Sequence, residues 1–203
     1  NREGNTLITE VFCNALYNNR GAWIAAKATP LYDKDGEIIG VIESLRDLTL
    51  KKREELEREI IYKIGELSLT DISFDELLMR IYENINKVFY AKNCYVALYD
   101  DINDVVSFPF FIDLFDPKPE PRKSKKGLTE YVIKTSKPLL LTDEILNNLI
   151  ENEEVEIIGT PPVSWLGVPL QIQSKIIGVL VIQSYDQNIK YEDKDKTLMS
   201  LIA

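Results

Sequence analysis

The stretch SWLGVPLQIQSKIIGVLVIQSYD, residues 164–186, is predicted to form two β-strands joined by a tight turn at Ser174 and Lys175. Its second half contains the run IIGVLVI, residues 176–182, which is apolar at every position. A strand of this kind has both of its faces covered by other parts of the fold. We therefore expect helices against one face of this strand, and the segment 118–159 as a lid over a possible ligand pocket on the other face.

Helices and strands alternate in the sequence that surrounds this hairpin. Ser73 is followed three positions later by Glu76, which is the spacing of a capping box at the start of a helix. The expected elements, in chain order, are a helix at 68–89, strands at 93–101 and 105–114, a proline-rich basic loop at 116–126, a helix at 127–137, an extended segment at 138–142, an acidic helix at 143–156 and, after the hairpin, a helix at 192–203. This order is typical of an α+β fold with an antiparallel sheet.

The first 47 residues have a different pattern, without any helix. Three strands are expected at 9–16, 23–32 and 37–47, joined by the turn sequences YNNRG (17–21) and DKDG (33–36). Such an antiparallel meander has one face that it cannot cover alone, so we expect the cover to precede Asn1 in a longer protein.

A charged segment, residues 48–69, follows this meander and is predicted to be a helix. Its apolar residues lie on one side of the helix; they are Leu56, Ile60, Ile64 and Leu67. This stripe fits a short two-stranded coiled coil, but its spacing is not a clean heptad series. A single amphipathic helix packed on the next domain fits equally well.

The composition excludes several classes of function. Hydrophobic residues make up 45% of the 203 residues, which is enough for a buried core, and the net charge of −9 disfavours nucleic acid as a partner. No apolar run approaches the roughly 18 residues of a membrane span, and no targeting signal opens the chain, so we expect a cytoplasmic protein. The chain has no histidine, and its two cysteines form no C-x-x-C pair. Phosphate-binding glycine motifs are absent as well, which leaves little basis for an enzyme.

The segment ATPLYDKDGEIIGVIESLRDLT, residues 28–49, resembles the end of a PAS domain. The resemblance rests on the last two strands, on their D-x-D-G turn, and on the closing D-x-T tripeptide Asp47, Leu48 and Thr49, which leads into a signalling helix. It covers about the final third of such a domain. The resemblance therefore implies that residues 1–48 are the C-terminal part of a PAS domain and that residues 49–68 are a linker helix.

Residues 69–203 resemble a GAF domain. The segments that carry the resemblance are CYVALYDD (94–101), SFPFFID (107–113), GLTEYVIKTSKPLLLT (127–142) and the hairpin at 164–186. Both families have an antiparallel sheet with helices on one face and a ligand pocket on the other. The tetrapeptide IIGV, which occurs at 38–41 and again at 176–179, is then interpreted as the same strand in two related domains, packed for the same reason.

Together these resemblances imply the sensory region of a cytoplasmic signalling protein, most similar to a sensor histidine kinase of a two-component phosphorelay. The GAF domain would sense a small ligand or a partner and would act through a helical linker in a homodimer, with an output domain elsewhere in the parent protein. The chain itself is not expected to be an enzyme. The alternative is a GAF domain without ligand that serves for dimerisation or as a spacer.

The ligand of such a domain is not identified by the sequence. No haem, bilin or metal is expected, because the histidines and cysteines that hold these groups in GAF domains are missing. The candidate pocket residues are aromatic: Tyr99, Phe108, Phe110, Tyr131 and Trp165. Five basic residues precede the helix expected at 127 and are interpreted either as an anion site or, preferably, as a solvated loop; they are Lys118, Arg122, Lys123, Lys125 and Lys126.

Overall fold

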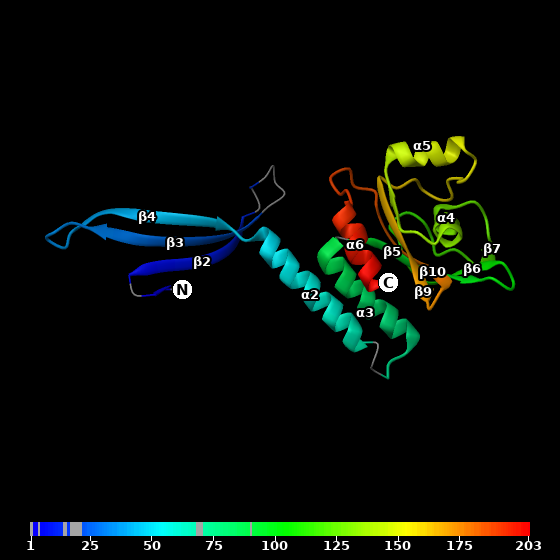
Figure 1. Ribbon diagram of the computed structural model, residues 1–203, viewed down its shortest axis with the longest axis horizontal. Helices are drawn as coiled ribbons and strands as arrows, with labels where there is room; N and C mark the ends of the chain where they lie inside the picture. Colours follow the sequence, from blue (N-terminus) through cyan, green and yellow to red (C-terminus); the bar gives the residue numbers. More distant parts are fainter. Residues whose placement is uncertain (1, 4, 14–15, 17–21, 68–70, 90) are drawn as a thin grey trace. The chain divides into compact units, whose positions relative to one another are not determined.

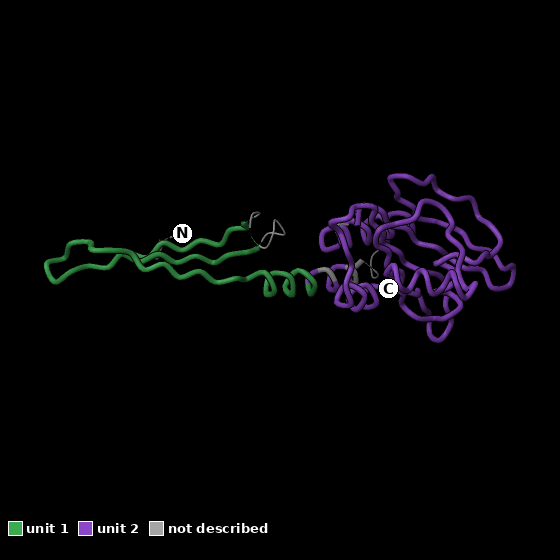
Figure 2. Tube along the Cα trace, turned by 90° about the horizontal axis from the view of Figure 1, so that it is seen from above, with its two compact units in different colours: residues 1–58 green, residues 59–203 purple. Residues whose placement is uncertain are grey.

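The computed structural model describes residues 2–3, 5–13, 16, 22–67, 71–89 and 91–203. The chain forms two compact units, Asn1–Arg58 and Glu59–Ala203 (Figure 2). Helix α2 (Thr49–Leu67) contributes to both units, so the division falls inside the helix that the sequence assigned to a separate linker. The turn expected at YNNRG, and the side chains of three of the four stripe residues of α2, lie outside the described part of the chain.

The first unit contains an antiparallel sheet in the order β1-β2-β3-β4. Its strands are β1 (Arg2–Glu3), β2 (Thr6–Cys13), β3 (Ala22–Tyr32) and β4 (Ile38–Asp47). The DKDG turn joins β3 to β4: the Asp33 carboxylate accepts hydrogen bonds from the backbone N–H groups of Asp35 and Glu37, both at 2.9 Å. Gly36 adopts φ 87°, a conformation that favours glycine. The three expected strands are present, and the short β1 extends the sheet by one.

The tripeptide Asp47, Leu48 and Thr49 fixes the start of α2 to strand β3. The backbone N–H of Thr49 donates to Asp47 Oδ1 at 2.7 Å, and the backbone N–H of Trp23 donates to Thr49 Oγ1 at 3.0 Å. The backbone N–H of Leu48 also donates to the carbonyl oxygen of Trp23 at 2.8 Å. Three hydrogen bonds thus join the end of the sheet to the first turn of the helix.

We expect Asp47→Ala to loosen this junction by about 1 kcal/mol, because it removes the acceptor of the Thr49 amide at a helix start. Hydrogen exchange of the amides of residues 48–52 measures the effect. Asp47→Asn is the matched control, since it keeps the side-chain oxygen that accepts the bond. Equal exchange rates in Asp47→Ala and the unaltered chain would show that the carboxylate does not hold the junction.

The second unit is built on a larger antiparallel sheet in the order β7-β6-β5-β10-β9-β8 (Figure 1). Its strands are β5 (Asn93–Asp100), β6 (Val105–Ile112), β7 (Arg122–Lys123), β8 (Leu139–Leu141), β9 (Ser164–Ile172) and β10 (Lys175–Ser184). The predicted hairpin is β9 and β10, and β10 lies between β9 and β5. Its apolar run therefore occupies the middle of the sheet.

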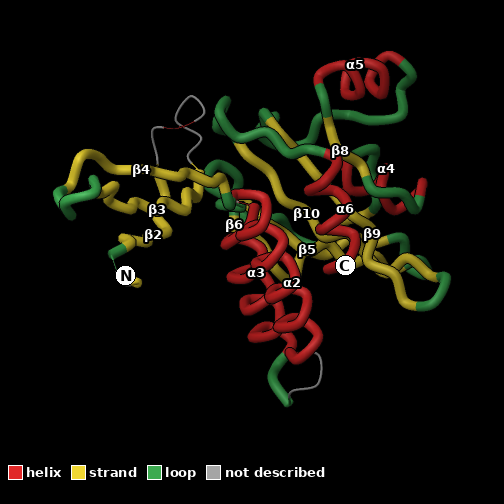
Figure 3. The backbone as a smooth tube through the Cα atoms, turned by 60° about the vertical axis from the view of Figure 1, so that its left-hand side comes forward, coloured by secondary structure: helices red, strands yellow, loops and turns green. Residues whose placement is uncertain are grey.

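Helices cover both faces of this sheet (Figures 1 and 3). Helices α3 (Phe74–Phe89) and α6 (Asp193–Ile202) pack on one face, where Ile85 and Met199 are fully buried. Helices α4 (Leu128–Thr135) and α5 (Asp143–Glu151) belong to the segment that covers the other face. The structure is thus the α+β fold expected from the sequence, with an antiparallel sheet, helices on one face and a lid segment on the other.

Strand β6 contains a β-bulge that changes which side chains face the lid. Val96 pairs with Phe110 and Leu98 pairs with Ser107, so Phe108 and Pro109 together lie opposite the single residue Ala97. The extra residue shifts the alternation of side chains along the strand. As a result Phe110 faces α3, whereas Phe108 and Phe111 both face the lid.

The two IIGV segments have different surroundings. Ile38 and Ile39 are 63% and 67% exposed, whereas Val179 is fully buried. A side chain at Gly40 would meet only Leu31 Cδ1, at 3.9 Å, but a Cβ at Gly178 would lie 2.1 Å from the carbonyl oxygen of Ala97 on β5. The two segments therefore have different neighbours in this chain. At Gly178 the close neighbour is the backbone of strand β5, which leaves no room for a side chain.

Candidate ligand-binding cavity

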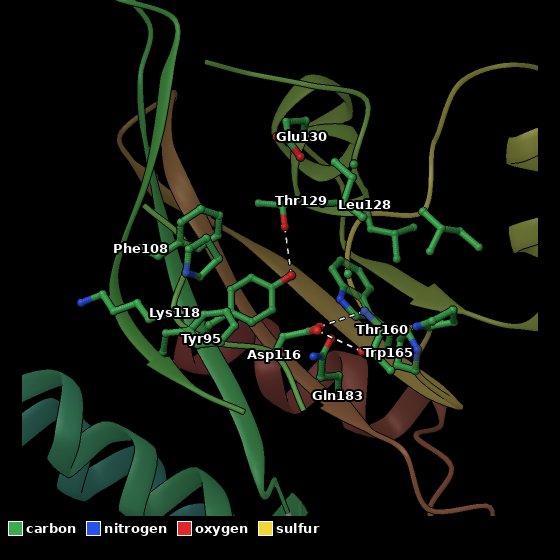
Figure 4. A pocket seen from close by; sticks show the side chains of 18 of the residues that line it. Tyr95, Phe108, Asp116, Lys118, Leu128, Thr129, Glu130, Thr160, Trp165 and Gln183 are labelled. Atoms are coloured by element: carbon green, nitrogen blue, oxygen red, sulfur yellow. Dashed lines mark hydrogen bonds between the residues drawn. The ribbon is translucent and has the colours of Figure 1, made fainter. Parts of the chain in front are cut away.

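A cavity of about 470 Å³ lies between the sheet and the lid segment of the second unit (Figure 4). The sheet contributes aromatic side chains from β5, β6 and β9, and the lid contributes the start of α4 and two proline-containing loops. The lining residues are Tyr95, Phe108, Phe111, Asp116, Pro117, Lys118, Pro119, Glu120, Arg122, Gly127, Leu128, Thr129, Glu130, Leu141, Leu146, Ile157, Ile158, Gly159, Thr160, Pro161, Pro162, Trp165 and Gln183. Its wall is thus mainly apolar, with a few polar groups at defined places.

Tyr95 lies at the centre of the sheet side of the cavity. Its ring packs against Phe111 with centroids 5.5 Å apart and against Phe108 with centroids 6.0 Å apart. The Tyr95 hydroxyl shares a hydrogen bond with the Thr129 hydroxyl on α4, at 2.9 Å (Figure 4). Burial raises the pKa of Tyr95 to about 12, so at neutral pH the phenol is protonated. This hydrogen bond joins the sheet to the first turn of the lid helix.

Two of the five aromatic residues proposed from the sequence, Phe108 and Trp165, line the cavity. Tyr99 lies near the end of β5, where its hydroxyl donates to Asp104 at 3.2 Å, and Tyr131 lies on α4; neither is among the lining residues. The prediction that Phe110 lines the pocket is wrong, because its side chain packs on the opposite face of the sheet, in the cluster that contains α3.

The β-bulge is the reason for this difference. Strict alternation places Phe108 and Phe110 on the same face, but the extra residue in β6 brings Phe111 to the cavity instead. A signal for the bulge is present in the sequence: Pro109 lies in the middle of the predicted strand, where it has no N–H to donate to the neighbouring strand.

Asp116 ties two loops together at one end of the cavity. Its carboxylate accepts hydrogen bonds from the backbone N–H and the hydroxyl of Thr160, both at 2.9 Å (Figure 4). Gly159 precedes this contact with φ 82°, and a Cβ there would lie 2.6 Å from Asp116 Oδ2. Next to it, Gln183 donates from Nε2 to Asp113 Oδ2 at 2.6 Å. The contacts of Asp116 hold the loop at 157–162 against the segment that follows β6, and the Gln183–Asp113 bond joins the start of that segment to β10.

The start of α4 forms the opposite end of the cavity. The Glu130 side chain is in the first turn of this helix and accepts hydrogen bonds from Arg122 and, at 3.2 Å, from the backbone N–H of Lys125. Both bonds go to Oε1. Oε2 is buried and accepts no hydrogen bond from the residues that the structure describes. Glu130 thus presents one satisfied and one unsatisfied oxygen.

The basic residues that precede α4 do not gather into an anion site. Arg122 lies on strand β7, which the sequence assigned to a loop, and pairs with Glu130. The side chains of three lysines donate to backbone carbonyl oxygens in the same unit: Lys118 to Pro109, Lys123 to Asn103 and Lys126 to Glu153. Lys118 and Lys123 therefore fasten the lid segment to β6 and to the turn before it, whereas Arg122 and Lys126 make contacts within the lid segment.

Metal and thiol chemistry have no assembled site in the described residues. No group of three or more Asp, Glu, Cys or His side chains is placed there to hold a metal ion. Cys94 lies on the face of the sheet away from the cavity, and burial raises the pKa of its thiol to about 12. The thiolate, which is the reactive form, is therefore not populated at neutral pH.

A family model for the GAF domain matches residues 71–203, more than half of the chain. The chain belongs to the GAF family. A GAF domain is a regulatory module of signalling proteins and is not by itself catalytic, although some enzymes have the same fold. No curated protein matches this chain. Among the helices that the structure describes, none combines the length and apolar character needed to cross a membrane.

Several solved structures share this fold. The GAF domain of an Acinetobacter phosphoenolpyruvate-protein phosphotransferase is 19% identical, with a TM-score of 0.56 over 75% of this chain and 89% of that chain. The GAF domain of A. aeolicus nlh2 is 14% identical, with a TM-score of 0.54 over 74% and 92%. Free methionine-R-sulfoxide reductase from Neisseria meningitidis, solved with its substrate, is 15% identical, with a TM-score of 0.57 over 72% and 83%. At these identities the similarity establishes the fold.

Proposed function

We propose that this GAF domain is a sensor that binds a small molecule in the cavity between the sheet and the lid segment. The observation that supports the proposal most strongly is the cavity itself, with a volume of about 470 Å³ and a wall that combines aromatic rings with a few buried polar groups. Ligand sites of proteins have this size and composition. A domain that served only as a spacer would gain stability by filling this space with side chains.

We propose further that the domain belongs to a cytoplasmic sensor histidine kinase and acts in a homodimer. The first unit supports this reading through its resemblance to the end of a PAS domain, because the D-x-D-G turn and the Asp47–Thr49 junction are both stabilised by their own hydrogen bonds. In this proposal α2 is the linker helix. It pairs with the same helix of the second protomer and transmits the signal toward an output domain. The alternative function is that of a ligand-free dimerisation domain.

Native mass spectrometry of the chain purified gently from its host tests the proposal. We expect a small-molecule mass that is lost under denaturing conditions. Leu146→Trp, which places a larger side chain on α5 at the cavity wall, should abolish this mass. The exposed neighbour on the same helix supplies a matched control, Asn147→Trp, which should retain it. Apo protein in every sample would favour the ligand-free dimerisation domain.

A further inference from the structure

The unsatisfied oxygen of Glu130 indicates what kind of ligand the cavity takes. We propose that the ligand is a small aromatic molecule with a hydrogen-bond donor, preferentially a cationic amine, and that Glu130 Oε2 receives this donor. The inference rests on the proposed function, since it concerns the ligand of the same cavity. It assigns to Glu130 a role in recognition, and it excludes anionic ligands as the preferred class.

The first argument is the hydrogen-bonding state of Glu130. Its side chain is only 7% exposed, and the two hydrogen bonds that it accepts both go to Oε1. Oε2 has no partner among the described residues. A buried carboxylate oxygen without a donor costs free energy, and such exceptions are uncommon in folded proteins. Because Glu130 lines the cavity, a ligand can supply the missing donor.

The second argument is the charge around the cavity. Three carboxylates line it, those of Asp116, Glu120 and Glu130. The two cations in the wall are already engaged: Lys118 donates to the carbonyl oxygen of Pro109, and Arg122 pairs with Glu130. Moreover, Glu130 lies in the first turn of α4, where the helix dipole would otherwise attract an anion. The carboxylates of the cavity wall would therefore repel an anionic ligand, and the described residues of the wall include no free cation that would offset this repulsion.

The third argument is the shape of the remaining wall. Tyr95, Phe108, Phe111 and Trp165 provide aromatic surfaces on the sheet side, and Leu128 and Leu146 provide apolar contacts from the lid helices. A flat aromatic body packs well on such a wall. Figure 4 shows the labelled residues of α4 at one end of the cavity and Asp116, Thr160 and Gln183 at the other. The ligand would place its aromatic part on the sheet and its donor toward α4.

Recognition by Glu130 would also involve the loop at 157–162. The position of a Cβ on Gly127 lies 2.6 Å from Glu130 Oε2 and 3.1 Å from Ile158 Cδ1, so the carboxylate and this methyl group border the same small space. Ile158 is 45% exposed and belongs to the loop. A donor that enters this space to reach Oε2 would also contact the Ile158 side chain, which would link ligand recognition to the position of the loop.

The test compares three indole compounds that differ at the end of one short side chain: tryptamine with an ammonium group, tryptophol with a hydroxyl and indole-3-acetate with a carboxylate. Binding to the full chain is measured by isothermal titration calorimetry. We expect tryptamine to bind at least about tenfold more tightly than indole-3-acetate, with tryptophol in between. Glu130→Gln keeps one oxygen for Arg122 but replaces the other with an NH₂ group, so it should reduce this preference to within about threefold.

Glu144→Gln is the matched control, because it removes the same charge from an exposed residue of α5 that is not among the lining residues, and it should preserve the preference. Equal binding of the three compounds, or a preference that survives Glu130→Gln, would overturn the inference while leaving the cavity as a ligand site. Binding of none of them would overturn it as well. The mass measurement on the host-purified chain decides the proposed function independently.

Discussion

Replacing Gly178 with valine is expected to prevent folding of the second unit. Even the Cβ atom of the new side chain would lie 2.1 Å from the carbonyl oxygen of Ala97, far inside contact distance. This oxygen belongs to the backbone of β5, which is paired with β10 at the centre of the sheet and has no free direction in which to move. We expect a loss of at least about 4 kcal/mol, which is much of the stability of an ordinary domain.

Urea denaturation measures this effect, followed by circular dichroism and by tryptophan fluorescence, to which the buried Trp165 of the second unit contributes. The chain provides its own control in Gly40→Val, which makes the same substitution in the other IIGV segment, where the nearest atom to the new Cβ is 3.9 Å away. We expect Gly40→Val to leave the second unit unchanged. A Gly178→Val variant that unfolds at the urea concentration of the unaltered chain would contradict the described pairing of β10 with β5.

The second large effect is expected from Gly167→Ala, which would disturb the cavity wall. The indole ring of Trp165 lies across Gly167, and a Cβ on this glycine would be 2.2 Å from Cη2 of the ring. Trp165 is only 1% exposed, so the ring has to move toward the cavity. We expect a loss of about 1 to 3 kcal/mol from this overpacking, together with weaker ligand binding.

A double-mutant cycle with Trp165→Phe isolates this contact. The atoms that overlap with the new Cβ are the outer atoms of the indole ring, Cη2, Cζ3 and Cζ2. The phenylalanine ring is smaller and does not extend as far from the backbone. The double variant should therefore be more stable than the sum of the two single effects indicates. Strictly additive changes in the free energy of unfolding would show that the ring does not lie over Gly167.

Most elements of the second unit are predictable from the sequence because local patterns determine them. The apolar run in β10 is expected to have both faces covered, and in the structure residues 178–182 of this strand are buried. Ser73 is expected to cap a helix, and the structure shows its hydroxyl accepting from the backbone N–H of Glu76 at 3.2 Å, with α3 beginning at Phe74. In both cases a few neighbouring residues contain the whole signal.

The candidate site was less predictable, since it depends on register and on contacts between distant segments. Aromatic residues were expected at the cavity, but the bulge at Phe108 and Pro109 decided which ones reached it. The short strand β7 formed in a segment that was interpreted as loop, because Arg122 and Lys123 pair with the edge of β6. Glu130 went unrecognised, as an acidic residue in the first turn of a helix is an ordinary feature of helix starts.

The order of strands in the sheet also has a consequence for biosynthesis. The central strand β5 is bordered on one side by β6, which follows it directly, but on the other side by β10, which is translated about 80 residues later. At roughly 5 to 20 residues per second, the ribosome leaves that edge without its partner for about 4 to 16 s. During this interval the backbone N–H and C=O groups on that edge of β5 have no partner strand, and they can pair with a strand of another nascent chain.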